Sequence, residues 1–241
     1  MSTKVLRSLT RARTPHALQP RRTFITLPGT EQTSLSATRI LPYNSNSLYK
    51  IIADVDSYSA FLPYCSSSQV TKWSSTDSAN KRWPSEADLK VGWGGYEETF
   101  TSRLYCVPGS IVEALGGEAV TSIPQSQVAH HKDKHSTRAE ANSLFQSISA
   151  RWTVKPFHYK SPSGHPQTEK TEHPAREQTE VHLNLDFRFS NPIYAALSKA
   201  VAPKVAGIMI EAFEVRARKL LDGPEANVVQ DVVTERKRVE A

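Results

Sequence analysis

The side chains that could carry acid–base chemistry are scattered along this 241-residue chain rather than grouped. Glu97 and Glu98 are adjacent, so on a strand they would point to opposite faces and could not act as a pair. Asp54 falls where a short helix is expected to end, which favours a local hydrogen bond, and Asp186 falls on the polar face of an expected strand. The sequence contains no Ser-His-Asp grouping and no phosphate-binding glycine motif. We therefore expect no catalytic site.

Metal chemistry has equally little support in the sequence. His130, His131 and His135 lie in a polar stretch that we expect to be a mobile loop, and their spacing matches no ligand motif. The two cysteines, Cys65 and Cys106, are far apart and form no CxxC pair, so neither a disulfide framework nor a structural zinc site is predicted. We expect the protein to hold neither a metal nor a cofactor.

The last third of the chain predicts one strand followed by one long helix. Apolar and polar side chains alternate strictly through Val181–Phe189, which is the pattern of a strand with one buried face. Asn191 is suited to cap a helix, and from Ile193 the apolar residues recur at helical spacing until Gly223. The expected rod is about 45 Å long, with a kink at Pro203. Its core-facing stripe is expected to run through Leu197, Val201, Val205, Ile208, Ala212 and Val215, with Met209, Phe213 and Leu220 beside it.

The rest of the chain predicts strands around that helix. A first strand at 33–41 precedes two short helices, at 48–55 and 58–62. Further strands are expected at 66–73, 87–93, 96–107, 111–115 and 144–154. The order predicts an α+β domain over 33–221, in which a curved antiparallel sheet encloses one long C-terminal helix. Flexible insertions are expected at about 118–142 and 157–180, and a charged tail at 225–241.

Residues 1–30 have the composition of a mitochondrial transit peptide. They carry six basic residues and many hydroxyls, and the first acidic residue of the chain is Glu31. We expect cleavage near Arg22-Thr23-Phe24. The formal charge of the whole chain is +6, but much of the excess sits at the two ends, so no nucleic-acid partner is predicted. No apolar run approaches the length of about 20 residues that a membrane span needs.

The run Tyr49–Cys65, with the sequence YKIIADVDSYSAFLPYC, resembles the signature of the mitochondrial coenzyme Q-binding proteins. These form a branch of the START-like, polyketide-cyclase-like superfamily, which has the helix-grip fold. Five later stretches resemble the same family: Ala87–Gly92, Glu98–Ser102, Leu144–Trp152, Phe187–Pro192 and Ala212–Ala217. The similarity covers roughly residues 35–221, and the two insertions depart from it.

The resemblance implies a lipid-binding protein on the matrix side of the inner mitochondrial membrane. It would bind ubiquinone or a related polyprenyl quinone, support respiratory electron transport and coenzyme Q synthesis, and have no enzymatic activity. Enzymes of coenzyme Q synthesis would be its expected protein partners.

A quinone carrier needs an apolar tunnel with few polar groups. We expect the concave sheet face and the helix to line it, although the same residues could equally fill a solid core. The predicted ligand-binding residues are Leu89, Val91, Trp93, Phe100, Trp152, Leu185 and Phe187 from the sheet, and Val205, Ile208, Met209 and Ala212 from the helix.

The cluster Phe61-Leu62-Pro63-Tyr64 next to a helix end could form a gate that meets the bilayer. Lys50 and Lys72 would be attracted to anionic lipid nearby. The alternative is that Phe61 packs into the core as a hydrophobic staple.

Two other functions remain open at this point. Similar helix-grip folds serve as cyclases, but such an enzyme needs acid–base groups inside the cavity, and the alternation places almost none there. Bacterial relatives of the fold are described as ribosome-binding modules. Quinone retention, cyclase turnover and sedimentation with ribosomes would separate the three functions.

Overall fold

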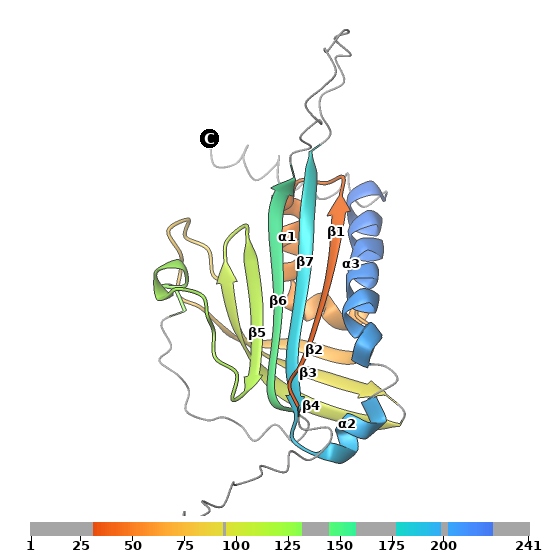
Figure 1. The fold of residues 1–241 in the computed structure, drawn as a ribbon. Coiled ribbons are helices and arrows are strands. Elements are labelled where there is room, and N and C mark those ends of the chain that lie inside the picture. The colour runs from red at the N-terminus through yellow and green to blue at the C-terminus, as the bar shows by residue number, and fades with distance from the viewer. Residues whose placement is uncertain (1–30, 94, 132–144, 158–176, 199–201, 224–241) are drawn as a thin grey trace, which may run out of the picture.

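The computed structural model describes residues 31–93, 95–131, 145–157, 177–198 and 202–223. In these residues seven strands form one antiparallel sheet in the order β1-β7-β6-β5-β4-β3-β2 (Figure 1). The strands are β1 (Thr33–Leu41), β2 (Cys65–Trp73), β3 (Pro84–Trp93), β4 (Tyr96–Val107), β5 (Ile111–Gly117), β6 (Phe145–Phe157) and β7 (Gln178–Phe189). The sheet is bent, because β2–β4 run across the direction of β1, β7 and β6 (Figure 1).

Short helices and one longer helix accompany the sheet. They are α1 (Ser45–Ala53), η1 (Val55–Ala60), η2 (Gln125–Gln127), α2 (Pro192–Ser198), η3 (Ala202–Lys204) and α3 (Val205–Asp222), where η marks a 3₁₀-helix. Helices α1 and α3 pack on the concave face of the sheet, α1 mainly against β6 and α3 mainly against β1. The predicted α+β fold, a curved antiparallel sheet closed by a C-terminal helix, is confirmed.

The strict alternation in β7 is confirmed residue by residue. Val181, Leu183, Leu185, Phe187 and Phe189 are buried, while the residues between them are partly exposed. Strand β7 pairs with β1 on one side and β6 on the other, so neither of its edges is free and its inward residues belong to the concave face. This position explains why the pattern is so regular, since a slip of one residue would expose the whole apolar set.

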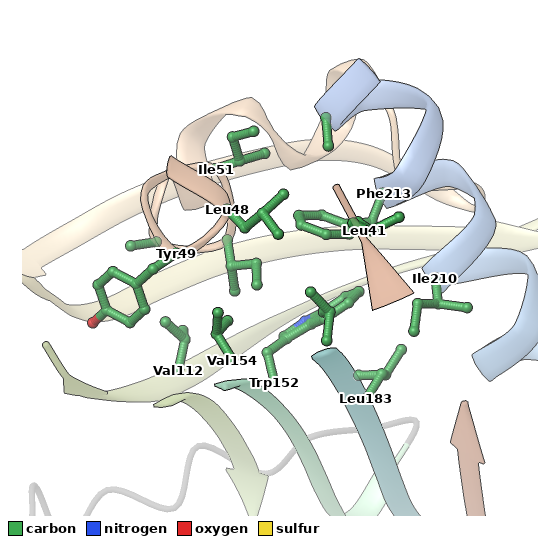
Figure 2. Packing of buried hydrophobic residues seen from close by; sticks show 14 of the residues in the cluster. Leu41, Leu48, Tyr49, Ile51, Val112, Trp152, Val154, Leu183, Ile210 and Phe213 are labelled. Atoms are coloured by element: carbon green, nitrogen blue, oxygen red, sulfur yellow. The ribbon is translucent and has the colours of Figure 1, made fainter. Parts of the chain in front are cut away.

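One half of the concave face is solidly packed. Phe213 of α3 lies against Trp152 of β6, with ring centroids 5.3 Å apart, and Leu48 of α1 fills the space beside them (Figure 2). Ile210 and Leu183 close the same cluster from α3 and β7. This cluster joins both helices to the sheet and is the main stabilising core.

The predicted single C-terminal helix is wrong. The structure instead has α2, then η3, then α3, and residues 199–201 lie outside the described chain. Pro203 is the physical reason, because a proline lacks the N–H that a helix interior needs but fits a first turn. It therefore stands in η3, just before α3, instead of kinking a continuous rod. Helix α3 alone has 18 residues, which is about 27 Å.

The predicted buried stripe of this helix is also wrong. The buried residues of α3 are Ala206, Ile210, Phe213 and Ala217. Ile208 and Ala212 are half-buried, and Val215 is 59% exposed. Small alanines face the sheet because α3 lies close to β1, where a larger side chain would not fit.

Three other local predictions need correction. The second short helix is the 3₁₀-helix η1 at Val55–Ala60, earlier in the chain than expected. The first part of the 118–142 insertion is packed rather than loose. Ile123 and Val128 are buried, and the His131 imidazole accepts the backbone N–H of Cys106 at 3.0 Å. The second insertion is also narrower than predicted, because Phe157 belongs to β6 and Gln178 to β7.

The predicted transit peptide at 1–30, the tail at 225–241, and residues 132–144 and 158–176 of the insertions lie outside the described residues. Among the helices that are described, none is long and apolar enough to cross a membrane.

Candidate functional site

The other half of the concave face is hollow. A cavity of about 190 Å³ lies between β3–β7, the first turns of α3 and the chain from Val55 to Cys65. Typical small-molecule sites measure roughly 300–1,000 Å³, so a long-chain ligand would place only one end in this space. The wall is almost entirely apolar. The sequence allowed either a solid core or a tunnel, and the structure has both: a filled core beneath α1 and an empty space beside it.

Small residues at the centre of the sheet leave this space open. Ala114 of β5 pairs with Leu104 on one side and with Ala150 of β6 on the other, and Ala150 pairs with Leu185. All four side chains line the cavity. Two adjacent alanines stand here, whereas bulky residues cover the part of the sheet beneath α1. The small alanine side chains do not reach across the space above them, so the sheet is not closely packed there.

An aromatic cluster closes one end of the cavity. Phe145 lies 5.8 Å from Phe100, 6.0 Å from Phe187 and 5.2 Å from Phe189, measured between ring centroids. Most of these contacts are edge-to-face, an arrangement that aromatic pairs favour. Ala195 of α2 packs on the same cluster, so α2 covers this end of the sheet.

The turn between η1 and β2 is the most exposed part of the cavity wall, and we take it as the mouth. Leu62, Pro63 and Tyr64 all line the cavity, and Tyr64 is 39% exposed. Tyr64 has a φ of 66°, an uncommon conformation for a bulky residue, and its carbonyl accepts the N–H of Gly92 at 2.9 Å. This bond ties the turn to β3 and holds Tyr64 at the surface.

The few polar groups in the wall are uncharged. The Tyr58 hydroxyl donates to the carbonyl of Ile52, and the Cys65 thiol donates to the carbonyl of Ser67. Burial raises the pKa of both groups, so both stay protonated at neutral pH. Ser102 of β4 adds one buried hydroxyl. No carboxylate, imidazole, ammonium or guanidinium of the described residues lines the cavity.

Eight of the eleven predicted ligand-binding residues line the cavity: Leu89, Val91, Phe100, Trp152, Leu185, Phe187, Val205 and Met209. Ile208 and Ala212 do not, because the buried face of α3 is turned away from the predicted one. Trp93 ends β3, and its side chain lies outside the described part of the chain.

The sequence missed three kinds of cavity residue. It did not single out the alanines at 114 and 150, the Ser102 hydroxyl, or the aromatic residues Phe145 and Phe189. Phe189 could have been found, since it continues the alternation of Leu185 and Phe187. The alanines and the serine carry no such signal, because nothing in their type shows that they border a void.

The carboxylates considered for catalysis lie elsewhere. Glu97 is exposed and bonds Lys90 at 2.6 Å, and this bond holds the pKa of its carboxyl below the usual value. Glu98 is on the same strand but outside the cavity wall. Asp54 accepts the Ser57 hydroxyl, as expected for a local bond, and Asp186 lies on the opposite face of β7.

His130 and His131 contradict the prediction of a mobile loop. Both are buried, their rings are 4.4 Å apart, and the His130 carbonyl accepts the N–H of Ser75 at 3.1 Å. Burial lowers the pKa of His131 to about 4, so its imidazole is neutral at neutral pH. His135 lies outside the described residues.

The predicted membrane-contact residues are not grouped as expected. Phe61 packs edge-on against Tyr58 at 5.6 Å, which fits the staple alternative, and Leu62 is buried. Only Pro63 and Tyr64 of the cluster reach the mouth surface. Lys50 is on α1, which covers the packed half. Lys72 bonds Glu86 at 2.8 Å near the far end of β2, about 23 Å along the strand from Cys65.

The family pattern described as polyketide cyclase / dehydrase and lipid transport matches residues 41–214, which include nearly the whole sheet, the cavity and most of α3. The chain belongs to this family. Two curated relatives are the mitochondrial coenzyme Q-binding proteins of Schizosaccharomyces pombe and Eremothecium gossypii. They are 27% and 28% identical, over 76% and 83% of this chain and 85% and 80% of their own length.

Other proteins that are similar to this chain have different names. The ribosome association toxin RatA of Pseudomonas aeruginosa is 24% identical, over 78% of this chain and 97% of its own. Among solved structures, a START superfamily protein from Mycobacterium smegmatis has a TM-score of 0.52 and covers 78% of this chain and 98% of its own. An aromatase/cyclase from Streptomyces has a TM-score of 0.51 and covers 79% and 96%. Both structures are 14% identical to the chain and support the helix-grip fold.

Proposed function

We propose that this chain binds coenzyme Q (ubiquinone), or a related polyprenyl quinone, in the apolar cavity and catalyses no reaction on it. One observation carries the proposal: the cavity wall is apolar and holds no charged side chain among the described residues. Two relatives that match most of the chain are named for coenzyme Q binding, which selects a quinone from the apolar ligands that would fit.

The energetics favour a ligand with an apolar chain. Burial of one methylene is worth about 0.8 kcal/mol, so one five-carbon isoprene unit supplies about 4 kcal/mol. The aromatic wall of Phe100, Phe145 and Phe187 offers ring faces and edges to a quinone head. The small volume allows the head and the first part of the tail to enter, and the rest of the tail leaves through the mouth.

The absence of acid–base groups in the wall speaks against the cyclase alternative. A cyclase must move protons at defined positions, and that requires a group whose pKa lies near the working pH. The buried ionisable groups of the wall, the phenol of Tyr58 and the thiol of Cys65, have raised pKa values and donate to backbone carbonyls, and the other phenol, that of Tyr64, lies at the exposed turn. The similarity to the ribosome association toxin does not point to any particular residue of the cavity.

More specifically, we propose that the chain is a peripheral protein on the matrix side of the inner mitochondrial membrane. It would deliver the quinone there, in support of respiratory electron transport and coenzyme Q synthesis, with enzymes of that synthesis as its partners. The exposed Tyr64 at the mouth supports a membrane-facing entrance.

The test is lipid retention by the folded protein. Protein purified from a quinone-producing host is extracted and the lipids are identified by mass spectrometry, and delipidated protein is titrated with decylubiquinone while quenching of tryptophan fluorescence is followed. Retained quinone and saturable quenching are expected, since Trp152 lines the cavity. Folded protein that retains no quinone and shows no saturable quenching would refute the proposal, and sedimentation with ribosomes or turnover of a polyketide would then indicate the alternative.

A further inference from the structure

Ser102 is a buried hydroxyl in an otherwise apolar wall. It lies on β4 between Phe100 and Leu104, faces the cavity and is only 2% exposed. Within the described chain its hydroxyl has no hydrogen-bond partner. A hydroxyl in an apolar environment without a partner is destabilising by about 1–3 kcal/mol. A hydroxyl that faces an apolar cavity without a protein partner points to a ligand that supplies one.

The other polar groups of the wall leave few alternatives. Tyr58 and Cys65 already donate to backbone carbonyls. The indole N–H of Trp152 also has no partner in the described residues, but its ring is packed against Phe213 in the solid half. Ser102 and Trp152 are thus the buried side-chain donors of the wall that remain for a ligand, and the Tyr64 hydroxyl is a further donor at the exposed turn.

The register of the strands places Ser102 well inside the cavity. Ser102 pairs with Ala87 of β3. Val91, further along β3, pairs with Glu98 of β4. On its other side Val91 pairs with Cys65, next to the mouth. Four residues separate these two pairs, which is about 13 Å along the strand. A group bonded to Ser102 therefore lies at depth, with the mouth behind it.

We propose that Ser102 donates a hydrogen bond to a ring carbonyl of the bound quinone, so that the head enters first and the tail leaves past Tyr64. This inference rests on the proposed quinone binding. A hydroxyl is a suitable donor for a carbonyl acceptor, and a single donor in an apolar wall fixes orientation without trapping the ligand. Ser102 is then a positioning residue that distinguishes a quinone from a hydrocarbon of equal size.

The test compares two ligands with the same tail. Delipidated Ser102→Ala and wild-type protein are titrated with decylubiquinone and with decylbenzene, which has the ring and the chain but no oxygen. Loss of one neutral hydrogen bond is expected to raise the Kd for the quinone by about threefold to tenfold and to leave the Kd for decylbenzene unchanged. The variant should be at least as stable to heat as the wild type, because it removes an unpaired buried hydroxyl.

A matched control is available on the neighbouring strand. Ser85 of β3 also has a buried hydroxyl without a partner in the described chain, but it does not line the cavity. Ser85→Ala should bind both ligands like the wild type. Infrared spectra of ¹³C-carbonyl decylubiquinone supply a second readout: the carbonyl stretch should be lowered in the wild type and in Ser85→Ala, and return to higher frequency in Ser102→Ala.

Three results would overturn the inference. Equal quinone affinity in Ser102→Ala and the wild type would show that no bond is made. Equal losses for both ligands, with a lower melting temperature, would show a structural role. A carbonyl band that moves in Trp152→Phe but not in Ser102→Ala would assign the bond to the indole. A wild type that takes up decylbenzene but not the quinone, or neither ligand, would instead refute the proposed function, and the inference with it.

Discussion

Ala150→Leu tests whether the hollow half of the molecule is the binding site. Ala150 stands at the centre of the cavity floor, between Ala114 on β5 and Leu185 on β7. A leucine at this position would extend into the empty space instead of into packed neighbours. The same change should therefore raise stability and weaken binding.

Both magnitudes follow from the three carbons that leucine adds. Their burial is worth about 2.4 kcal/mol at about 0.8 kcal/mol each, and ordering the side chain costs about 0.5–1 kcal/mol. The net gain of about 1.5–2 kcal/mol corresponds to a rise of about 3–8 °C in the melting temperature of a domain of this size. The ligand loses the same contacts, and a loss of about 2.4 kcal/mol weakens the Kd roughly 50-fold.

Thermal unfolding by circular dichroism and titration with decylubiquinone measure the two effects on the same protein. Ala217→Leu is the control, because Ala217 is fully buried where α3 meets the sheet in the packed half. Overpacking there should destabilise the protein by about 1–3 kcal/mol and leave quinone affinity unchanged below the melting temperature.

If Ala150→Leu lowers stability and binding together, the alanine faces closely packed neighbours rather than a void. If binding is unchanged, the ligand does not occupy the cavity, since it is indifferent to the cavity floor.

Three further predictions concern other parts of the molecule. Tyr64→Asp at the exposed mouth should reduce flotation with cardiolipin-containing liposomes several-fold at an unchanged melting temperature, and equal flotation would argue against a membrane-facing mouth. The pKa of His131 falls from 6.5 to about 4 on folding, so its contribution to stability is complete above pH 6.5 and is lost as the pH falls towards 4. His131→Gln should flatten this decline in urea titrations, and an unchanged pH profile would show that His131 is not its source. Arg151→Ala removes the guanidinium that bonds the buried Glu113 carboxylate at 2.8 Å. The free energy of unfolding in urea should fall by about 2–4 kcal/mol. A fall below about 1 kcal/mol would show that Glu113 does not depend on this partner.

Alternation of apolar and polar residues made much of the sheet predictable from the sequence, most clearly in β7. A strand with one buried face has a strict period of two. The predicted strands at 33–41 and 96–107 coincide with β1 and β4. Pro108 and Gly109 mark the turn that connects β4 to β5 in a hairpin. Local chemistry determines these features, so they appear in the local sequence.

The orientation of α3 could not be predicted in the same way. Apolar residues occur on several of its faces, and Val215 is exposed whereas Ile210 is fully buried, although both side chains are branched and apolar. The face is decided by distance to β1, which favours Ala206 and Ala217 for their small size. A pattern that ranks residues by hydrophobicity gives alanine little weight, and so places the stripe one or two residues away.

The buried histidines show a similar limit. The segment before His131 is polar, and composition alone predicts a loop. Strand β3 pairs with β4 only as far as Arg103, and further along β4 the imidazole accepts the free N–H of Cys106. The N–H of Cys106 needs this acceptor because β3 does not pair with β4 at that position. No local sequence pattern shows where the pairing ends.

The division into a packed half and a hollow half explains how the fold can hold a ligand site. An apolar cavity costs about 24 cal/mol per Å³, so about 190 Å³ corresponds to as much as 4–5 kcal/mol of lost packing. Native domains are stable by only 5–15 kcal/mol, so a void of this size requires an efficient core elsewhere. The cluster around Phe213, Trp152 and Leu48 supplies that core, and Trp152 borders both halves. A ligand in the cavity recovers part of the lost packing, and ligand-bound protein should therefore be the more stable form at every temperature below melting.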